Sequence, residues 1–225
     1  MNSRTDQILR VRRTKAQAKE SYDKISRFYD YFAGMFEKKY RTMALEWLHV
    51  NKGETVLEIG FGTGHCLRHI AESVGEHGKS YGIDISSGML EVSKKKLQDA
   101  GLLDRVELYC GDALQIPYED NKFDAVFMSF TLELFDTPEI LKVLAEITRV
   151  LKPNGRLGVV SMSKEDSDSL LLRLYEWVHK KIPNYVDCRP IYVEESIKEA
   201  GFQIKLKVKV KLFGLPGEIV IGVKP

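Results

Sequence analysis

Three glycines, Gly60, Gly62 and Gly64, directly follow an apolar run at residues 55–59, and their spacing suggests a binding site. Glycine carries no Cβ, so its backbone can approach a ligand closely, and a helix that begins after such a turn favours negative charge. The turn therefore predicts a site for a nucleotide-like ligand. The dinucleotide fingerprint GxGxxG would place its third glycine at position 65, which here is His65.

Acidic side chains flank this turn on both sides. Glu58 lies two residues before the first glycine, and Asp84 ends the next predicted strand. In a doubly wound sheet, a carboxylate at the place of Asp84 faces the crevice and can accept hydrogen bonds from both hydroxyls of a ribose. The alternative role for Asp84 is that of an ordinary turn or helix-capping aspartate.

Two further segments follow the third and fourth predicted strands. They are Gly111-Asp112-Ala113 and Ser129-Phe130. Ligands bind at the carboxyl ends of the strands in open α/β sheets, so we expect both segments to line the same crevice as the glycine turn.

No side chain is identified as a general base, and the catalytic residues are left unassigned. Glu133 and Tyr185 lie on segments that could reach the crevice. His65, Cys66 and His69 are close in sequence, but the two histidines lack the glutamate of an HExxH zinc helix. No metal site is predicted.

The elements that must position these residues alternate between strand and helix. Such alternation is typical of an α/β fold with a mostly parallel sheet and helices on both faces. Ser86 is placed to cap the helix after the second strand, and Thr137-Pro138-Glu139 predicts another helix start. The predicted strands occupy residues 55–59, 80–85, 105–110, 123–129 and 156–162.

The last third of the chain breaks this alternation. An amphipathic helix is predicted around Leu170–Trp177. Residues 204–212 then alternate apolar residues with lysines, and a glycine-proline turn leads to residues 218–223. Strand, turn and strand predict an antiparallel hairpin at the end of a parallel sheet. The lysines are interpreted as protection of an edge strand, with a basic binding stripe as the alternative.

The first 50 residues differ from the rest in composition. Residues 1–41 hold eleven Lys or Arg against five Asp or Glu, and aromatic residues cluster at positions 22–36. We expect residues 1–50 to form a helical lid segment and residues 51–225 to form the binding domain, within one compact unit. The basic run could touch an anionic membrane surface, or it could be a solvated helix face.

The overall composition excludes several other classes. Hydrophobic residues make up 44% and charged residues 29% of 225, which suits a globular core, and a net charge of +2 gives no reason to expect a nucleic-acid partner. The three cysteines offer no disulfide framework. No apolar stretch reaches the roughly 18 residues of a membrane-spanning helix, and no signal-peptide core is present. A cytoplasmic protein is predicted, and its oligomeric state is left open.

The motifs together resemble those of class I methyltransferases that use S-adenosylmethionine (SAM). The resemblance rests on the glycine turn with Glu58, on Asp84 and on Gly111-Asp112-Ala113, and it spans roughly residues 50–165. Phe123-Asp124 and Leu151-Lys152-Pro153-Asn154-Gly155 extend it. It implies a Rossmann-like sheet of seven strands, and SAM as the methyl donor to a small-molecule acceptor.

The same resemblance implies roles for individual residues. The glycine turn would hold the methionine part of SAM, with Glu58 near its amino group. Asp84 would bind the ribose, and Ile85 and Met89 would pack on the adenine. The adenine's exocyclic amine would bond to Asp112, with Ala113 donating from the backbone. Ser129 and Phe130 would close the floor of the site.

Within this class, the chain resembles the ubiquinone/menaquinone C-methyltransferase branch. The segments that carry this resemblance are Ser21-Tyr22-Asp23, Phe28-Tyr29-Asp30 and Arg189-Pro190-Ile191. In that branch aromatic N-terminal helices cover the active site, which would place Tyr29 near the donor; the alternative is that these aromatics only pack helices together. Residues 130–135 depart from the Gly-Leu-Arg-Asn-like stretch usual after the fourth strand. The acceptor therefore stays open between a quinone-like molecule and a lipid amine.

Two other functions remain as alternatives. One is a SAM-binding module that has lost catalysis, and tight SAM binding without turnover would favour it. The other is an NAD-dependent oxidoreductase, against which both His65 and the terminal hairpin argue.

Overall fold

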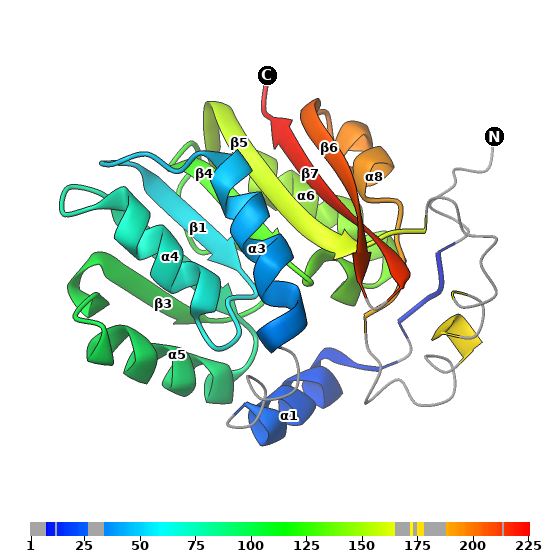
Figure 1. Cartoon of the computed structure of the whole chain (residues 1–225), viewed down its shortest axis with the longest axis horizontal. Helices are drawn as coiled ribbons and strands as arrows, with labels where there is room; N and C mark the ends of the chain where they lie inside the picture. The colour runs from blue at the N-terminus through cyan, green and yellow to red at the C-terminus, as the bar shows by residue number, and fades with distance from the viewer. Residues whose placement is uncertain are drawn as a thin grey trace.

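The computed structural model describes residues 8–11, 13–26, 34–164, 172, 175–177, 188–212 and 214–225 (Figure 1). Its strands are β1 (Thr55–Ile59), β2 (Lys79–Asp84), β3 (Val106–Cys110), β4 (Phe123–Ser129), β5 (Leu151–Met162), β6 (Gln203–Leu212) and β7 (Leu215–Val223). They form one seven-stranded sheet in the order β3-β2-β1-β4-β5-β7-β6. The first five strands run parallel, whereas β7 lies antiparallel to both β5 and β6. The predicted Rossmann-like fold with a terminal hairpin is confirmed.

Helices cover both faces of this sheet. They are α3 (Gly34–Leu48), α4 (His65–Val74), α5 (Ser87–Asp99), α6 (Thr137–Val150) and α8 (Val193–Glu199), whereas α1 (Lys15–Ile25) lies beyond the ends of the strands and packs against α5 (Figure 1). Apolar residues of α6 and α8 pack on one face of the sheet, and those of α3 and α4 pack on the other. The central strands β1, β2 and β4 are therefore buried on both faces, as parallel strands between two helical layers are.

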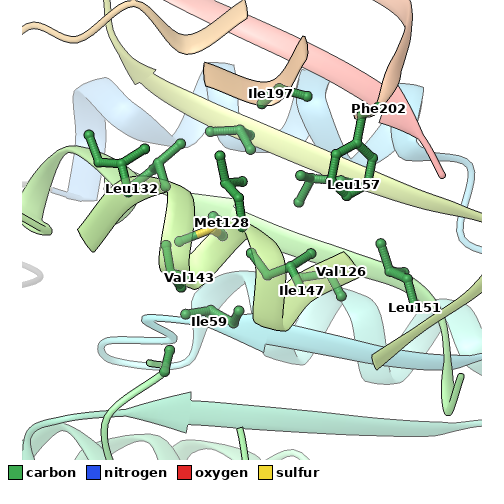
Figure 2. Close-up of a cluster of buried hydrophobic side chains, with 14 of the residues drawn as sticks. Ile59, Val126, Met128, Leu132, Val143, Ile147, Leu151, Leu157, Ile197 and Phe202 are labelled. Carbon is green, nitrogen blue, oxygen red and sulfur yellow. The ribbon is translucent and has the colours of Figure 1, made fainter. Parts of the chain in front are cut away.

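Figure 2 shows the packing between the sheet and the helices α6 and α8. Val143 and Ile147 of α6 face Met128 of β4, and all three side chains are fully buried. Ile197 of α8 closes the same cluster over β5. This cluster fixes β4 and α6, and so fixes the turn between them that borders the site.

Capping residues set where the helices begin. Ser86 caps α5 as predicted, because its hydroxyl accepts a hydrogen bond from Met89 N at 3.0 Å. The helix predicted to start at Thr137-Pro138-Glu139 is capped by the residue before it, Asp136, in a reciprocal box with Glu139. A carboxylate caps a helix at least as well as a threonine hydroxyl does, and Thr137 becomes the first helical residue.

The boundaries in the last third differ from the prediction. Strand β5 begins at Leu151, five residues before the predicted start, because Leu151 pairs with Phe123 across an irregularity in the ladder. Of the predicted helix around Leu170–Trp177, the described residues 172 and 175–177 are helical, and Leu170, Leu171 and Leu174 lie outside the described part.

The lysine-rich strand β6 forms one edge of the sheet. Lys205, Lys209 and Lys211 are exposed on it, while Lys207 pairs with Glu194 of α8 at 2.7 Å. Charged side chains on an edge disfavour pairing with another chain. This position favours the interpretation of edge protection.

The strand order creates the place for a ligand. From β1 the chain proceeds outward to β2 and β3, and then returns to β4 on the other side of β1. The connections after β1 and β4 therefore leave the sheet toward opposite faces. Ligands bind in the crevice at such a reversal of strand order, outside the carboxyl ends of the strands.

Candidate functional site

A cavity of about 520 Å³ lies at the carboxyl ends of β1 to β4. Every predicted binding residue that the structure describes lines it except Gly64. Tyr29 lies outside the described residues, as does Tyr185. The predicted residues that share this cavity are Glu58, Gly60, Gly62, Asp84, Ile85, Met89, Asp112, Ala113, Ser129 and Phe130.

The glycine turn has a backbone that only glycine adopts easily. Gly60, Gly62 and Gly64 have φ values of +73°, +51° and +79°. A Cβ on Gly60 would overlap the side chain of Thr131, and one on Gly64 would overlap Ser93 of α5. By contrast, a Cβ on Gly62 would meet nothing within 4 Å. Gly60 and Gly64 thus allow close packing, and the backbone at Gly62 borders open space in the cavity.

Asp84 links the glycine turn to the end of β2. One carboxylate oxygen accepts from Gly62 N at 2.9 Å, and the other accepts from Ser86 N at 2.9 Å. The bond from Ser86 N is the kind that a turn aspartate accepts. Asp84 therefore also has the turn-stabilising role that was the alternative to ribose binding. Burial raises the pKa of Asp84 to about 6, and the nearby Asp23 adds to the shift, whereas both backbone bonds oppose it.

Glu58 is buried at the other end of the turn, with 2% of its surface exposed. Burial raises the pKa of its carboxyl group well above the usual range; the positive charge of Arg41 opposes this and the negative charge of Asp84 adds to it. Its carboxyl group accepts from Leu67 N in the first turn of α4. Its Oε2 is buried and has no hydrogen-bond partner among the described residues.

The floor and the far end of the cavity contain the other predicted residues. Phe130 is buried with a φ of +52°, an uncommon value for a residue with a side chain. Ser129 Oγ is buried and has no partner in the described part of the chain. Asp112 accepts from Leu114 N at 3.0 Å and forms an ion pair with Lys15 Nζ at 2.6 Å.

The N-terminal segment supplies lining residues that sequence reasoning missed. Thr14, Lys15 and Ala18 line the cavity together with Tyr22. The next residue, Asp23, accepts hydrogen bonds from Ser86 Oγ at 2.6 Å and from Gly88 N at 2.8 Å. The resemblance at Ser21-Tyr22-Asp23 was the available signal, but it did not show that α1 closes the cavity and braces the start of α5.

Residues 8–11 are fixed to the body by two charged side chains. Asp136 accepts from Arg10 Nε at 2.8 Å and from Val11 N at 3.0 Å. Arg189 has no exposed surface, donates to the carbonyl of Leu9 at 2.6 Å, and also donates to the carbonyl of Phe135. Burial lowers the pKa of Arg189 to about 10, so its guanidinium is charged at neutral pH. These contacts hold the segment beside the cavity.

Glu133 lies close to this region, but it does not line the cavity. Its carboxyl group is fully buried and accepts from Met162 N at 3.3 Å, on the side of β5. His65 lines the cavity, and its ring lies 2.9 Å from Lys96 Nζ. Neither side chain is placed as a general base.

The described ranges contain neither a metal-binding cluster nor a membrane-spanning helix. No group of three or more His, Cys, Asp or Glu side chains there is arranged to hold a metal ion. Nor does any helix within those ranges have the length and apolar character to cross a bilayer.

Comparison with known proteins identifies the family of this chain. The profile of a family described as a methyltransferase domain matches residues 56–155. The demethylmenaquinone methyltransferase of Symbiobacterium thermophilum is 32% identical over 213 residues, which cover 82% of this chain and 84% of that protein. A protein of the same name from Bacillus mycoides is 39% identical over 147 residues, but this match covers only 64% of the chain and 61% of the relative.

Solved structures share the fold. A SAM-dependent methyltransferase from Aquifex aeolicus is 28% identical with a TM-score of 0.62, and the match covers 82% of this chain and 89% of that one. The [4+2]-cyclase SpnF has a TM-score of 0.78 over 97% of this chain and 98% of its own, at 21% identity. The second likeness shows the fold alone.

Proposed function

This chain belongs to the class I SAM-dependent methyltransferases, and from that premise we propose where it holds SAM and what it methylates. The enzyme transfers a methyl group from SAM to a small-molecule acceptor. We place SAM in the cavity at the carboxyl ends of β1 to β4, and we propose a quinone-like acceptor. The placement is carried by one observation: the glycine turn, Glu58, Asp84 and Asp112 line a single cavity.

The residues of the cavity suit the parts of SAM. The buried Glu58 Oε2 and Ser129 Oγ, which lack described partners, offer bonding positions for a polar ligand. We assign the methionyl end to Glu58 and the glycine turn, and the ribose hydroxyls to Asp84. The adenine then lies between Met89 and Ile85, with Asp112 and Ala113 at its polar edge. Ser129 and Phe130 close the floor.

SAM, when bound, supplies a methyl group on a positively charged sulfur that is also a good leaving group. The chain's own contribution is to orient the two reactants and to exclude water, which lowers the barrier without a strong acid or base. Val11, Phe130 and Leu134 line the cavity with apolar side chains and serve this exclusion. Methylation at carbon also requires that a proton be removed, and the residue that accepts it is unassigned.

A quinone-like acceptor is supported by two observations. The relatives from Symbiobacterium thermophilum and Bacillus mycoides are both named demethylmenaquinone methyltransferase, and the match to the first covers 84% of that protein. The cavity extends beyond the proposed SAM contacts to Leu134, Phe135 and Cys188, which give it a partly apolar wall. An aromatic, weakly polar ring suits such a wall better than a charged amine does.

An assay with labelled SAM tests the acceptor. Reduced demethylmenaquinone, phosphatidylethanolamine and a panel of small amines are offered to the purified chain under identical conditions. We expect label to enter the reduced quinone because its ring carbon is electron-rich and the cavity wall is apolar. Transfer to the lipid amine alone would contradict the quinone assignment while leaving the methyl donor unchanged.

The pKa of Asp84 makes SAM binding depend on pH. In the free protein this pKa is about 6, and hydrogen bonds from the ribose hydroxyls lower it in the complex because they stabilise the ionised form. Affinity should therefore rise as the pH increases toward 6, by at most about tenfold per unit, and level off above it. Calorimetric titration between pH 5 and 8 measures this curve, and Asp84→Asn should flatten it.

We also propose that residues 1–50 act as a lid over the domain formed by residues 51–225. Support comes from the contacts of Arg10 with Asp136 and of Lys15 with Asp112 and Glu139, which join the two parts beside the cavity. The same contacts occupy two of the basic side chains that a membrane surface would need. Peripheral membrane contact and a cytoplasmic location stay predictions.

A further inference from the structure

Three lysine or arginine side chains line the cavity in the described part of the chain, and they lie at different ends of it. Lys15 forms ion pairs with Asp112 at 2.6 Å and with Glu139 at 3.0 Å. The guanidinium of Arg13 lies 5.3 Å from the centre of the Tyr22 ring, beside the cluster that contains Met89. Lys15 and Arg13 therefore belong to the end assigned to the adenine.

Arg41 lies at the opposite end. It projects from α3, and its guanidinium carbon lies 5.9 Å from the centre of the Phe130 ring. Its charge acts on the buried carboxyl group of Glu58 and opposes the rise in the pKa of that group. Arg41, Glu58 and Phe130 therefore surround the end of the cavity assigned to the methionyl group of SAM.

The chemistry of this end requires two opposite charges. The methionyl group of SAM carries an α-ammonium and an α-carboxylate on the same carbon atom, and both must leave water. An ion buried without a partner costs several kcal/mol, roughly, so each needs a counter-charge. Glu58 can supply the negative one. A guanidinium supplies the positive one in a planar fork that fits both carboxylate oxygens.

Several backbone donors at this end are engaged already. Leu67 N, in the first turn of α4, donates to Glu58, and Gly64 N donates to Phe61 O at 2.9 Å. The backbone of Gly60 donates to Ile83 O at 2.7 Å. A guanidinium is a stronger partner for a carboxylate than a single backbone N–H group is, and Arg41 brings the guanidinium that lines this end.

We propose that Arg41 binds the α-carboxylate of SAM, while Glu58 faces the α-ammonium. This inference rests on the proposed placement of SAM and adds a positioning residue that lies outside the motif series of residues 50–165. By fixing both charges of the methionyl group, Arg41 and Glu58 fix the direction of the bond between sulfur and the methyl carbon. Arg41 thereby sets the orientation of the methyl group toward the acceptor.

Calorimetry with two ligands tests the proposal. SAM and decarboxylated SAM, which lacks only the α-carboxylate, are titrated into the wild type, R41M and R41K. As a matched control we choose R68M, because Arg68 lies on the exposed face of α4 and pairs there with Glu72. The melting temperature of each variant without ligand shows whether it folds.

We expect R41M to weaken the binding of SAM by about 10- to 100-fold, the usual effect of losing hydrogen bonds between charged groups. Binding of decarboxylated SAM should change by less than about threefold, because it has no group for Arg41 to contact. R41K keeps the charge without the fork and should give an intermediate loss. The control R68M should bind both ligands as the wild type does.

Equal weakening of both ligands by R41M, or unchanged binding of SAM, would overturn the role of Arg41. If R41M does not fold, the same comparison with R41K decides the question, because its loss must also be confined to SAM. A wild type that binds neither ligand would instead overturn the placement of SAM, which is a different failure.

Discussion

Gly60→Ala should lower the free energy of unfolding by about 3 kcal/mol and the melting temperature by about 10 °C. Two costs combine at this position. An alanine at a φ of +73° is strained, and its Cβ would lie 2.9 Å from the Cβ of Thr131 and closer still to the rest of that side chain. Thr131 is buried beside the end of β4 and its hydroxyl is bonded to Ser129 O, so it has little room to move.

Gly101→Ala separates the two costs. Gly101 has a similar φ of +67°, but a Cβ there would meet nothing within 4 Å. The control should therefore lose only the strain, about 1 kcal/mol. Thermal unfolding of the three proteins, followed by circular dichroism, gives the comparison. If Gly60→Ala were no more destabilising than Gly101→Ala, the close packing of the glycine turn on Thr131 would be wrong.

Asp84→Ala should weaken the binding of SAM by about 1–3 kcal/mol, which is roughly 5- to 150-fold. The carboxylate is assigned to the ribose hydroxyls, and it also holds Gly62 N and Ser86 N at 2.9 Å. Its removal costs both the direct bonds and the bracing of the turn. Titration calorimetry at pH 7.5, where the wild-type carboxylate is ionised, measures the loss.

Two controls accompany this variant. Asp104→Ala removes an exposed carboxylate in the short 3-10 helix before β3 and should leave the affinity for SAM unchanged. Asp84→Asn keeps one oxygen acceptor but cannot accept from both backbone N–H groups. Its affinity for SAM should therefore be lower than that of the wild type and higher than that of Asp84→Ala. An affinity unaltered by Asp84→Ala would remove this residue from the proposed site.

Much of the fold was predictable because its signals are local. Strand and helix patterns alternate from the apolar run at residues 55–59 onward. Such alternation is typical of a parallel α/β sheet. The hairpin was equally clear, since residues 204–212 alternate on a period of two. The start of β5 was missed because Leu151 continues the helical periodicity of α6, and only its pairing with Phe123 assigns it to the sheet.

The site was predictable in part for the same reason. Glu58, Asp84 and Asp112 each stand at the end of a predicted strand, so the topology alone brings them to one edge. Lys15 and Arg41 carry no motif, and they reach the cavity through packing of α1 and α3 that no local pattern encodes. Likewise, the bond between Arg10 and Asp136 joins residues 126 positions apart.

A crystal structure of the chain with S-adenosylhomocysteine tests the central claim most directly. We predict that its ribose hydroxyls lie within hydrogen-bond distance of Asp84 and that its amino-acid end lies against Glu58 and Arg41. The adenine should occupy the space between Met89 and Asp112. A ligand bound outside this cavity, or bound with its ribose away from Asp84, would contradict the account.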